Sequence, residues 1–145
     1  MLDINDAKEI LTRFIREVWS EGDIEASDKF IASKYTIHHD HGDPWDGKVL
    51  DLATYKERVR SLRSAFPDQH FDIHGLFADN NAVVVTWYWT ATHLGDIPGF
   101  PASGKQIKMS GATVYYFDGD RLTGHWQITD RLGVYQQLLK NKSDA

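Results

Sequence analysis

Histidine is the residue type in this chain best suited to acid–base chemistry, because its unperturbed pKa lies close to neutrality. The chain contains seven histidines and no cysteine. Three of them fall in one short run, His38-His39-Asp40-His41. The other four lie on or beside segments that predict strands: His70, His74, His93 and His125. Each could instead be a surface histidine or a hydrogen-bonded core histidine, so its place in the fold decides its role.

The strand that contains His125 carries a second concentration of polar side chains. On a strand, His125 and Gln127 point to the same face of the sheet. If the preceding turn has three loop residues, Phe117 faces Arg121 and Tyr115 joins the other two on that face. Burying these polar groups is unfavourable unless they are satisfied, which favours a ligand or water cavity over an ordinary polar sheet face.

Several chemistries are excluded by what the chain lacks. Without cysteine there is no thiolate nucleophile, iron–sulfur cluster or cysteine-type zinc site. Neither a glycine-rich phosphate loop nor a GxSxG nucleophile motif occurs. His39 and His41 are spaced like two metal ligands on one strand face, but no third ligand is evident, so we predict no metal and no other cofactor. A metal-assisted hydrolase using His39, His41 and a carboxylate stays open as an alternative.

The composition predicts one globular domain. The chain has 145 residues, with 16 Lys and Arg against 21 Asp and Glu, so its formal net charge is −5. This length predicts a single domain over residues 1–145, of which 140–145 form a polar tail. The acidic balance argues against a nucleic-acid partner. No run approaches the roughly 18 apolar residues of a membrane span, and the lack of cysteine suits a reducing compartment, so we expect a cytoplasmic protein.

The periodicity of the apolar residues divides the chain into helices and then strands. Helical spacing from Ile10 to Trp19, a short helix capped by Asp23 and a third helix between Asp51 and Pro67 predict three N-terminal helices. After Pro67 the period is that of four long antiparallel strands in two hairpins. The fold class is therefore α+β, with the helices packed on a long, curved, mainly antiparallel sheet that encloses a cone-shaped pocket. We expect the sheet to bend at glycines, namely Gly111 and Gly124.

The predicted strand from Ala82 to Leu94 is apolar on both faces. One set of side chains points one way: Val83, Val85, Trp87 and Trp89. The opposite set includes Val84, Tyr88 and Leu94. An antiparallel sheet with one face in water would alternate apolar and polar residues instead. One face should therefore line the core and pocket, and the other should meet a second copy of the chain in a homodimer or a larger assembly.

Short motifs in a consistent order give the chain a family resemblance. They are Val18-Trp19-Ser20-Glu21-Gly22-Asp23, Tyr35 followed by His38, Ala65-Phe66-Pro67-Asp68, Thr92-His93-Leu94-Gly95, Gly99 with Ser103-Gly104-Lys105, Asp118-Gly119-Asp120-Arg121-Leu122, His125-Trp126, Asp130 and Gln136-Gln137-Leu138. With these motifs over most of its length, the chain resembles the SnoaL-like polyketide cyclases, or ester cyclases, of the NTF2-like (cystatin-like cone) superfamily.

The resemblance implies a cofactor-free reaction. Enzymes of this family close a ring by intramolecular aldol condensation: a base removes an acidic C–H proton, and the enolate attacks a ketone. Their acid/base is an aspartate two residues after the position of His125, where this chain has Gln127, which cannot exchange a proton at neutral pH. The family's pocket histidine on the preceding strand falls at Tyr115. Its polar residue on the first short strand falls near Ile37 or His38.

Our leading hypothesis is a cofactor-free acid–base enzyme that acts on a small apolar carbonyl compound by cyclisation or a related proton transfer. His125 is the predicted base or acid, oriented by Asp130, while Gln127 and Tyr115 hold the oxyanion. His38 or His39 would be a second proton relay. The remaining ligand-binding residues, which shape the pocket and its mouth, are Trp87, Trp89, His93 and Phe100.

Two further functions stay open. Gln127, at the position of the catalytic aspartate, favours a non-catalytic small-ligand-binding module of the same superfamily. A dehydratase or hydrolase of that superfamily is the other possibility, because one fold supports many reactions.

Overall fold

A computed structural model of the chain describes residues 2–143. Its helical elements, in chain order, are α1 (Ile4–Phe14), the π-helical segment η1 (Ile15–Ser20), the 3-10 turn η2 (Ile24–Ala26), α2 (Ser27–Phe30), α3 (Leu52–Arg63) and α4 (Arg131–Ser143). The apolar stripe that predicts the first helix is buried, with Leu11, Phe14 and Val18 fully inaccessible. The predicted N-terminal helices are therefore present, and they pack their apolar face against the sheet.

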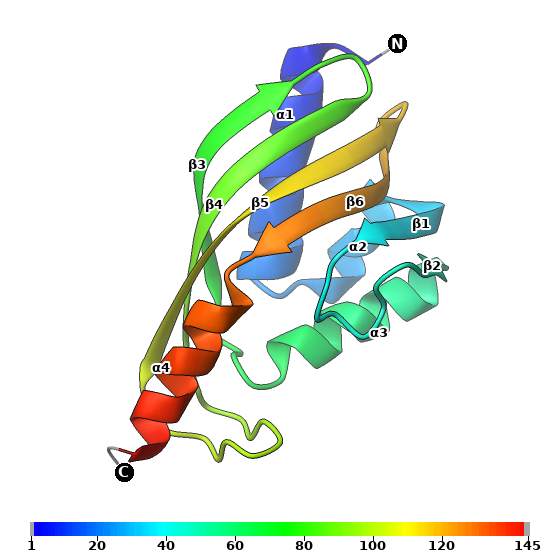
Figure 1. Ribbon diagram of the computed structural model, residues 1–145. Helices are drawn as coiled ribbons and strands as arrows, with labels where there is room; N and C mark the ends of the chain where they lie inside the picture. The colour runs from blue at the N-terminus through cyan, green and yellow to red at the C-terminus, as the bar shows by residue number, and fades with distance from the viewer. Residues whose placement is uncertain (1, 144–145) are drawn as a thin grey trace.

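Within the described residues, six strands form one curved sheet. They are β1 (Ile31–His39), β2 (Val49–Leu50), β3 (His70–Ala78), β4 (Ala82–Thr92), β5 (Gln106–Asp118) and β6 (Arg121–Thr129). Their order across the sheet is β2-β1-β6-β5-β4-β3, and all neighbours are antiparallel except β1, which runs parallel to β6. Figure 1 shows α1 behind the long strands and α3 beneath β1, so the helices close the hollow of the sheet. The predicted α+β cone fold is confirmed.

The inner face of the sheet is the core. Val83, Val85, Trp87 and Trp89 are at most 5% exposed, as the alternation of β4 predicts. Tyr115 of β5 meets Phe14 of α1 edge to face, with ring centroids 5.8 Å apart. Aromatic pairs of this geometry add to the stabilisation from buried area.

The hairpin between β5 and β6 differs from its predicted register by two residues. Asp118 pairs with Arg121, so the loop has two residues where three were predicted, which shifts the register by one residue. A bulge before Gly124 shifts it by one more. Tyr115 therefore faces His125 directly. Because a strand repeats every two residues, a two-residue shift keeps the same side chains on the same face. The grouping of Tyr115, His125 and Gln127 on one face is confirmed, although the pairing was wrong.

Gly111 has a different role from the bend predicted for it. The register between β4 and β5 is regular through this residue. A Cβ atom at Gly111 would lie 2.5 Å from Cζ2 of Trp87. The glycine therefore leaves the space that the Trp87 indole occupies against β5. The bulge at Gly124 does interrupt the ladder, near one of the two predicted positions.

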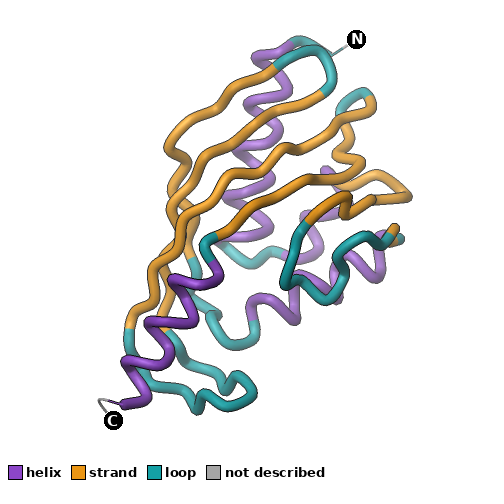
Figure 2. Tube along the Cα trace, in the orientation of Figure 1, coloured by secondary structure: helices purple, strands orange, loops and turns teal. Residues whose placement is uncertain are grey.

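Helix α4 is not predicted by the pattern of apolar residues in the sequence. Its sequence is only weakly amphipathic, and among its described residues only Leu138 is buried. It docks on β5 through Gln137, whose amide accepts from Lys108 N at 2.8 Å and donates to Lys108 O at 2.7 Å. Residues 140–143 of the predicted polar tail are the last turn of this helix, and residues 144–145 lie outside the described part. Figure 2 shows the loop between β4 and β5 alongside α4, where Phe100 packs on Tyr135.

The outer face of the sheet is apolar and uncovered in the single chain. Its exposed side chains are Phe77, Tyr88, Trp126 and Ile128. This agrees with the two apolar faces read from β4. Across residues 2–143, no helix is long and apolar enough to span a membrane.

Candidate active site

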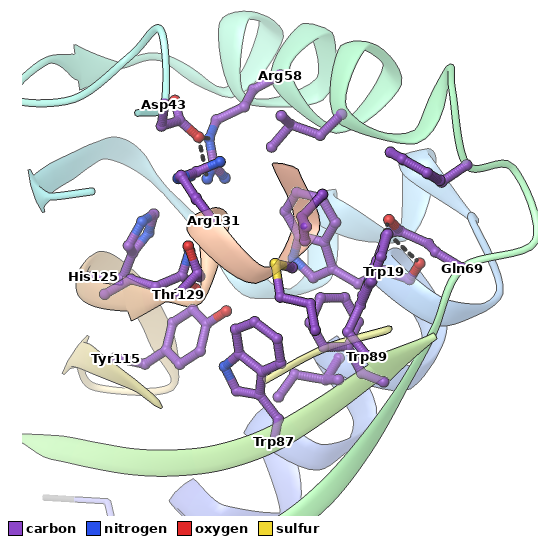
Figure 3. Close-up of a pocket in the computed structure, with 17 residues that line it drawn as sticks. Trp19, Asp43, Arg58, Gln69, Trp87, Trp89, Tyr115, His125, Thr129 and Arg131 are labelled. Carbon is purple, nitrogen blue, oxygen red and sulfur yellow. Dashed lines mark hydrogen bonds and ion pairs between the residues drawn. The ribbon is translucent and has the colours of Figure 1, made fainter. Parts of the chain in front are cut away.

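A cavity of about 250 Å³ lies between the inner face of the sheet and helices η1, α3 and α4. Figure 3 shows the side chains that line it. They are Ile15, Trp19, Asp43, Arg58, Leu62, Phe66, Gln69, Phe71, Trp87, Trp89, Met109, Tyr115, His125, Gln127, Thr129, Arg131 and Val134. Most are apolar or aromatic, and the charged groups gather at one end.

Two tryptophans of the aromatic wall have their indole nitrogens hydrogen-bonded within the protein, whereas the buried Trp19 indole nitrogen has no partner among the described residues. The Trp87 indole N–H donates to Thr113 Oγ1 at 2.9 Å, and the Trp89 indole N–H donates to Gln69 Oε1 at 3.1 Å. Phe71 meets Trp87 edge to face, with centroids 5.0 Å apart. With these donors occupied, the wall offers the cavity ring faces and edges, which suit a flat apolar ligand.

His125 lies at the polar end with both ring nitrogens engaged. Nε2 is 2.9 Å from Asp40 Oδ2, and Nδ1 is 2.7 Å from the Tyr35 hydroxyl. Since a carboxylate only accepts hydrogen bonds, we assign the proton to Nε2, and Tyr35 then donates to Nδ1. Burial lowers the pKa of His125 and the nearby Arg58 charge lowers it further, although Asp40 opposes both. His125 is therefore neutral at neutral pH, with the proton-accepting lone pair on Nδ1.

Asp40 is the centre of the polar network. Its Oδ2 accepts from His125 and, at 3.1 Å and 3.3 Å, from Gln127 Nε2 and Arg58 Nη2, while Oδ1 accepts from Arg131 Nη2 at 3.0 Å. Burial alone would raise the pKa of Asp40, but the His125 hydrogen bond and the surrounding positive charges outweigh it and lower the pKa. Asp40 is therefore a carboxylate, which agrees with a neutral His125 as its donor.

Two arginines complete this end of the cavity. Arg58, on α3, is 4% exposed and donates to Asp43 Oδ2 from Nε at 3.2 Å and Nη2 at 2.9 Å. Its guanidinium carbon lies 5.5 Å from the Trp19 ring centroid. Arg131, at the start of α4, also donates to the His41 carbonyl. A buried arginine needs such paired carboxylates, because an uncompensated charge in the interior is very costly.

Gln127 and Tyr115 lie beside this network on the sheet. Gln127 Oε1 accepts from the Thr113 hydroxyl at 2.7 Å, which leaves its amide nitrogen to donate. Among the described residues, the Tyr115 hydroxyl has no hydrogen-bond partner, and burial raises its pKa well above the ordinary value for tyrosine. Tyr115 is thus a neutral donor at the cavity.

The structure brings five predicted site residues to the cavity: His125, Gln127, Tyr115, Trp87 and Trp89. The assignment of Asp130 as the partner of His125 was wrong. Asp130 is exposed, and its carboxylate accepts from Gly133 N at 2.9 Å as the N-cap of α4. The carboxylate beside His125 comes from Asp40, which lies within the histidine run and is not among the predicted site residues.

Neither His38 nor His39 faces the cavity, so their assignment as a proton relay was also wrong. Ile37 points inward, which turns His38 outward against Tyr116. The ladder to β6 is irregular after Ile37, so His39 stacks on Trp126 and the next residue, Asp40, turns into the core. A polar residue just past the end of a strand is the one signal in the sequence for Asp40.

His93 and Phe100 also lie outside the cavity lining. His93 is buried against Phe66, with ring centroids 5.7 Å apart. Phe100 packs on α4. For the metal alternative, no group of three or more metal-binding side chains is found within residues 2–143.

The cone fold and its enclosed pocket define an NTF2-like protein. The SnoaL-like polyketide cyclase family model matches residues 9–138. The chain belongs to this family.

Solved structures agree with this membership. A candidate polyketide cyclase from Acidithiobacillus ferrooxidans is 75% identical, with a TM-score of 0.93 over 97% of this chain and 99% of that one. IdmH, a candidate polyketide cyclase from Streptomyces antibioticus, is 21% identical, with a TM-score of 0.76 over 91% and 97% of the two chains. AclR, a candidate hydroxylase from Streptomyces galilaeus, is 17% identical, with a TM-score of 0.80 over 95% and 83%. These last two show the fold alone. Comparison with curated proteins gives no match.

Proposed function

We propose that the protein is a cofactor-free acid–base enzyme that removes a proton next to a carbonyl group of a small aromatic substrate and closes a ring. The observation that carries the proposal is the Asp40–His125 pair at the polar end of an aromatic cavity. Buried acid–base pairs of this kind are typical of catalytic sites.

In the proposed reaction His125 is the base. The substrate C–H bond breaks, its electron pair forms the enolate, and the proton moves to Nδ1. The Tyr35 side chain must move away from Nδ1 for this step, since its hydroxyl lies 2.7 Å from that nitrogen and holds the lone pair in the structure. Asp40 then stabilises the imidazolium through Nε2–H. The enolate carbon attacks a carbonyl of the same molecule, and His125 returns the proton to the new alkoxide.

Gln127 and Tyr115 are suited to the developing negative charge on the enolate oxygen. Each offers a neutral donor at the cavity, and neither needs to exchange a proton. Gln127 Nε2 lies 3.1 Å from Asp40 Oδ2. In our proposal the carboxylate that related cyclases carry at the position of Gln127 is supplied here from the end of β1.

Deprotonation of 5-nitrobenzisoxazole, an aromatic carbon acid, tests the proposal. We expect His125→Gln to lower the rate by at least about a hundredfold, the usual contribution of a general base. His38→Gln, a histidine change on the outer surface, should leave the rate unchanged. Equal rates for the wild type and His125→Gln would contradict His125 as the base.

A non-catalytic ligand-binding module is the second candidate. It is favoured by the engagement of both His125 nitrogens and of the Gln127 amide within the protein. This function predicts saturable binding of aromatic ligands with no deprotonation above the rate in buffer.

We also propose that two copies of the chain pair through the outer face of the sheet. The exposed Tyr88, Trp126 and Ile128 give this face the apolar side chains that a two-fold interface buries.

A further inference from the structure

The charged end of the cavity holds two guanidinium groups that each keep one nitrogen unpaired. Arg58 uses Nε and Nη2 for Asp43 and Asp40, and Arg131 uses Nε and Nη2 for the His41 carbonyl and Asp40. Neither Nη1 atom has a partner within residues 2–143. Both side chains line the cavity, and Figure 3 shows them at the same end of it. Arg58 is buried, so the surface it retains faces the cavity.

Hydrogen bonds hold both guanidiniums in this orientation, although the Arg58 side chain is only 4% exposed and the Arg131 side chain is 42% exposed. Asp43 lies beside Arg58 in the cavity lining, and its other oxygen accepts from Trp45 N at 2.8 Å. Asp40 lies behind both arginines and does not line the cavity. A guanidinium held by its rear edge has little freedom left to lose when its free edge binds an acceptor. The arrangement is therefore preorganised for a ligand that carries acceptor oxygens.

The sign of the ligand charge follows from the lining. Asp43 is the one carboxylate among the lining residues, and both its oxygens already accept hydrogen bonds. A cationic ligand would find no carboxylate oxygen without a partner in the lining. The two arginines and two aspartates balance in charge, so an anion is held by donor geometry more than by net charge. The cavity should therefore bind an anion only moderately more tightly than a neutral analogue of the same shape.

We infer that the cavity takes a flat aromatic carboxylate, with the carboxylate oxygens on Nη1 of Arg58 and Arg131 and the ring system against Trp87 and Trp89. This rests on the proposed function, since it places the substrate of the same pocket. Anchored there, the substrate presents its ring and carbonyl carbons to His125 and Gln127 on the adjoining sheet.

Calorimetric titration of the full chain with 2-naphthoate and with the isosteric neutral 2-naphthamide tests the inference. We expect the carboxylate to bind about tenfold or more tightly than the amide, as charge-assisted hydrogen bonds allow. Arg131→Gln should remove this preference while leaving the affinity for the amide within about twofold. Arg131→Lys, which keeps the charge without the planar edge, should retain only part of it. Lys140→Gln removes the same charge from an exposed position of α4 and should change neither affinity.

Equal affinities of the wild type for the two ligands would overturn the inference, as would a preference that survives in Arg131→Gln or an absence of saturable naphthoate binding at millimolar concentration. The proposed function fails separately, through unchanged 5-nitrobenzisoxazole deprotonation in His125→Gln. A wild type that binds both ligands equally but still needs His125 for that reaction would reject only the aromatic carboxylate.

Discussion

Asp40 Oδ2 lies 2.9 Å from His125 Nε2, joining residues 85 positions apart in the chain. The pair exists because β1 runs parallel to β6, so that the residue after the end of β1 meets the inward-facing side chain of β6. This long-range contact decides which carboxylate serves the candidate base.

Replacing Asp40 should damage both stability and activity. Asp40→Asn removes the charge that balances Arg58 and Arg131, and breaking a buried pair of this kind costs about 3–5 kcal/mol. It should also slow 5-nitrobenzisoxazole deprotonation at least about a hundredfold. Chemical denaturation and the rate assay measure the two effects. Asp130→Asn is the matched control, because asparagine also caps a helix, and it should behave like the wild type. A wild-type rate in Asp40→Asn would contradict the role given to Asp40.

The lowered pKa of His125 predicts an acid-sensitive fold. Its pKa lies below the unfolded value of 6.5, so between these two values the unfolded chain binds more protons than the folded one. Stability is then full above pH 6.5 and falls as the pH drops through the folded pKa. Thermal unfolding of the wild type and of His125→Gln over this range should show a steeper loss in the wild type. Parallel curves would show that the pKa of His125 is not lowered by folding.

The same shift predicts the pH dependence of catalysis. The neutral imidazole is the active base, so the rate should fall on the acid side with a midpoint below pH 6.5. A midpoint above 6.5 in the deprotonation rate would argue against His125 as the group that titrates.

Gly111 should tolerate no side chain without loss of packing. In Gly111→Ala the new Cβ would lie 2.5 Å from Trp87 Cζ2 and 2.7 Å from the Ile128 carbonyl oxygen. Overpacking of this kind costs about 1–3 kcal/mol, and it should displace Trp87 and weaken 2-naphthamide binding. Ser110→Ala, at the neighbouring exposed position, is the control. Chemical denaturation measures the loss in unfolding free energy, and calorimetry measures the loss of 2-naphthamide binding. A Gly111→Ala protein as stable as the control would contradict close packing at this position.

The proposed two-fold interface predicts that charge on the outer sheet face separates the subunits. Ile128 is 55% exposed in the single chain, and Ile128→Lys would bury a charge in the interface, so sedimentation velocity should show monomers. Leu132→Lys places the same charge on α4, where Leu132 is 66% exposed, and should leave the assembly unchanged. A monomeric wild type would reject the interface.

The fold could be predicted because it depends on local patterns. Helical spacing up to Trp19 and the alternation of β4 are properties of single segments, so the cone and its inner wall follow from them. The face shared by Tyr115, His125 and Gln127 could also be predicted, since an error of two residues in register does not change the parity of a strand. The positions of Asp40 and Arg131 could not be predicted. Asp40 turns inward because the ladder between β1 and β6 is irregular, and Arg131 lies on α4, a helix that is only weakly amphipathic.

Helix α4 contributes side chains to the pocket but buries little of its own surface in the core. It supplies Arg131 and Val134 to the cavity, yet among its described residues Leu138 alone is buried. We therefore expect mutations along this helix, at positions other than Leu138, to alter which molecules the cavity admits with little effect on the stability of the domain. Such a segment is where we expect relatives to diverge in specificity first, and it is the natural starting point for directed evolution of new substrates on this scaffold.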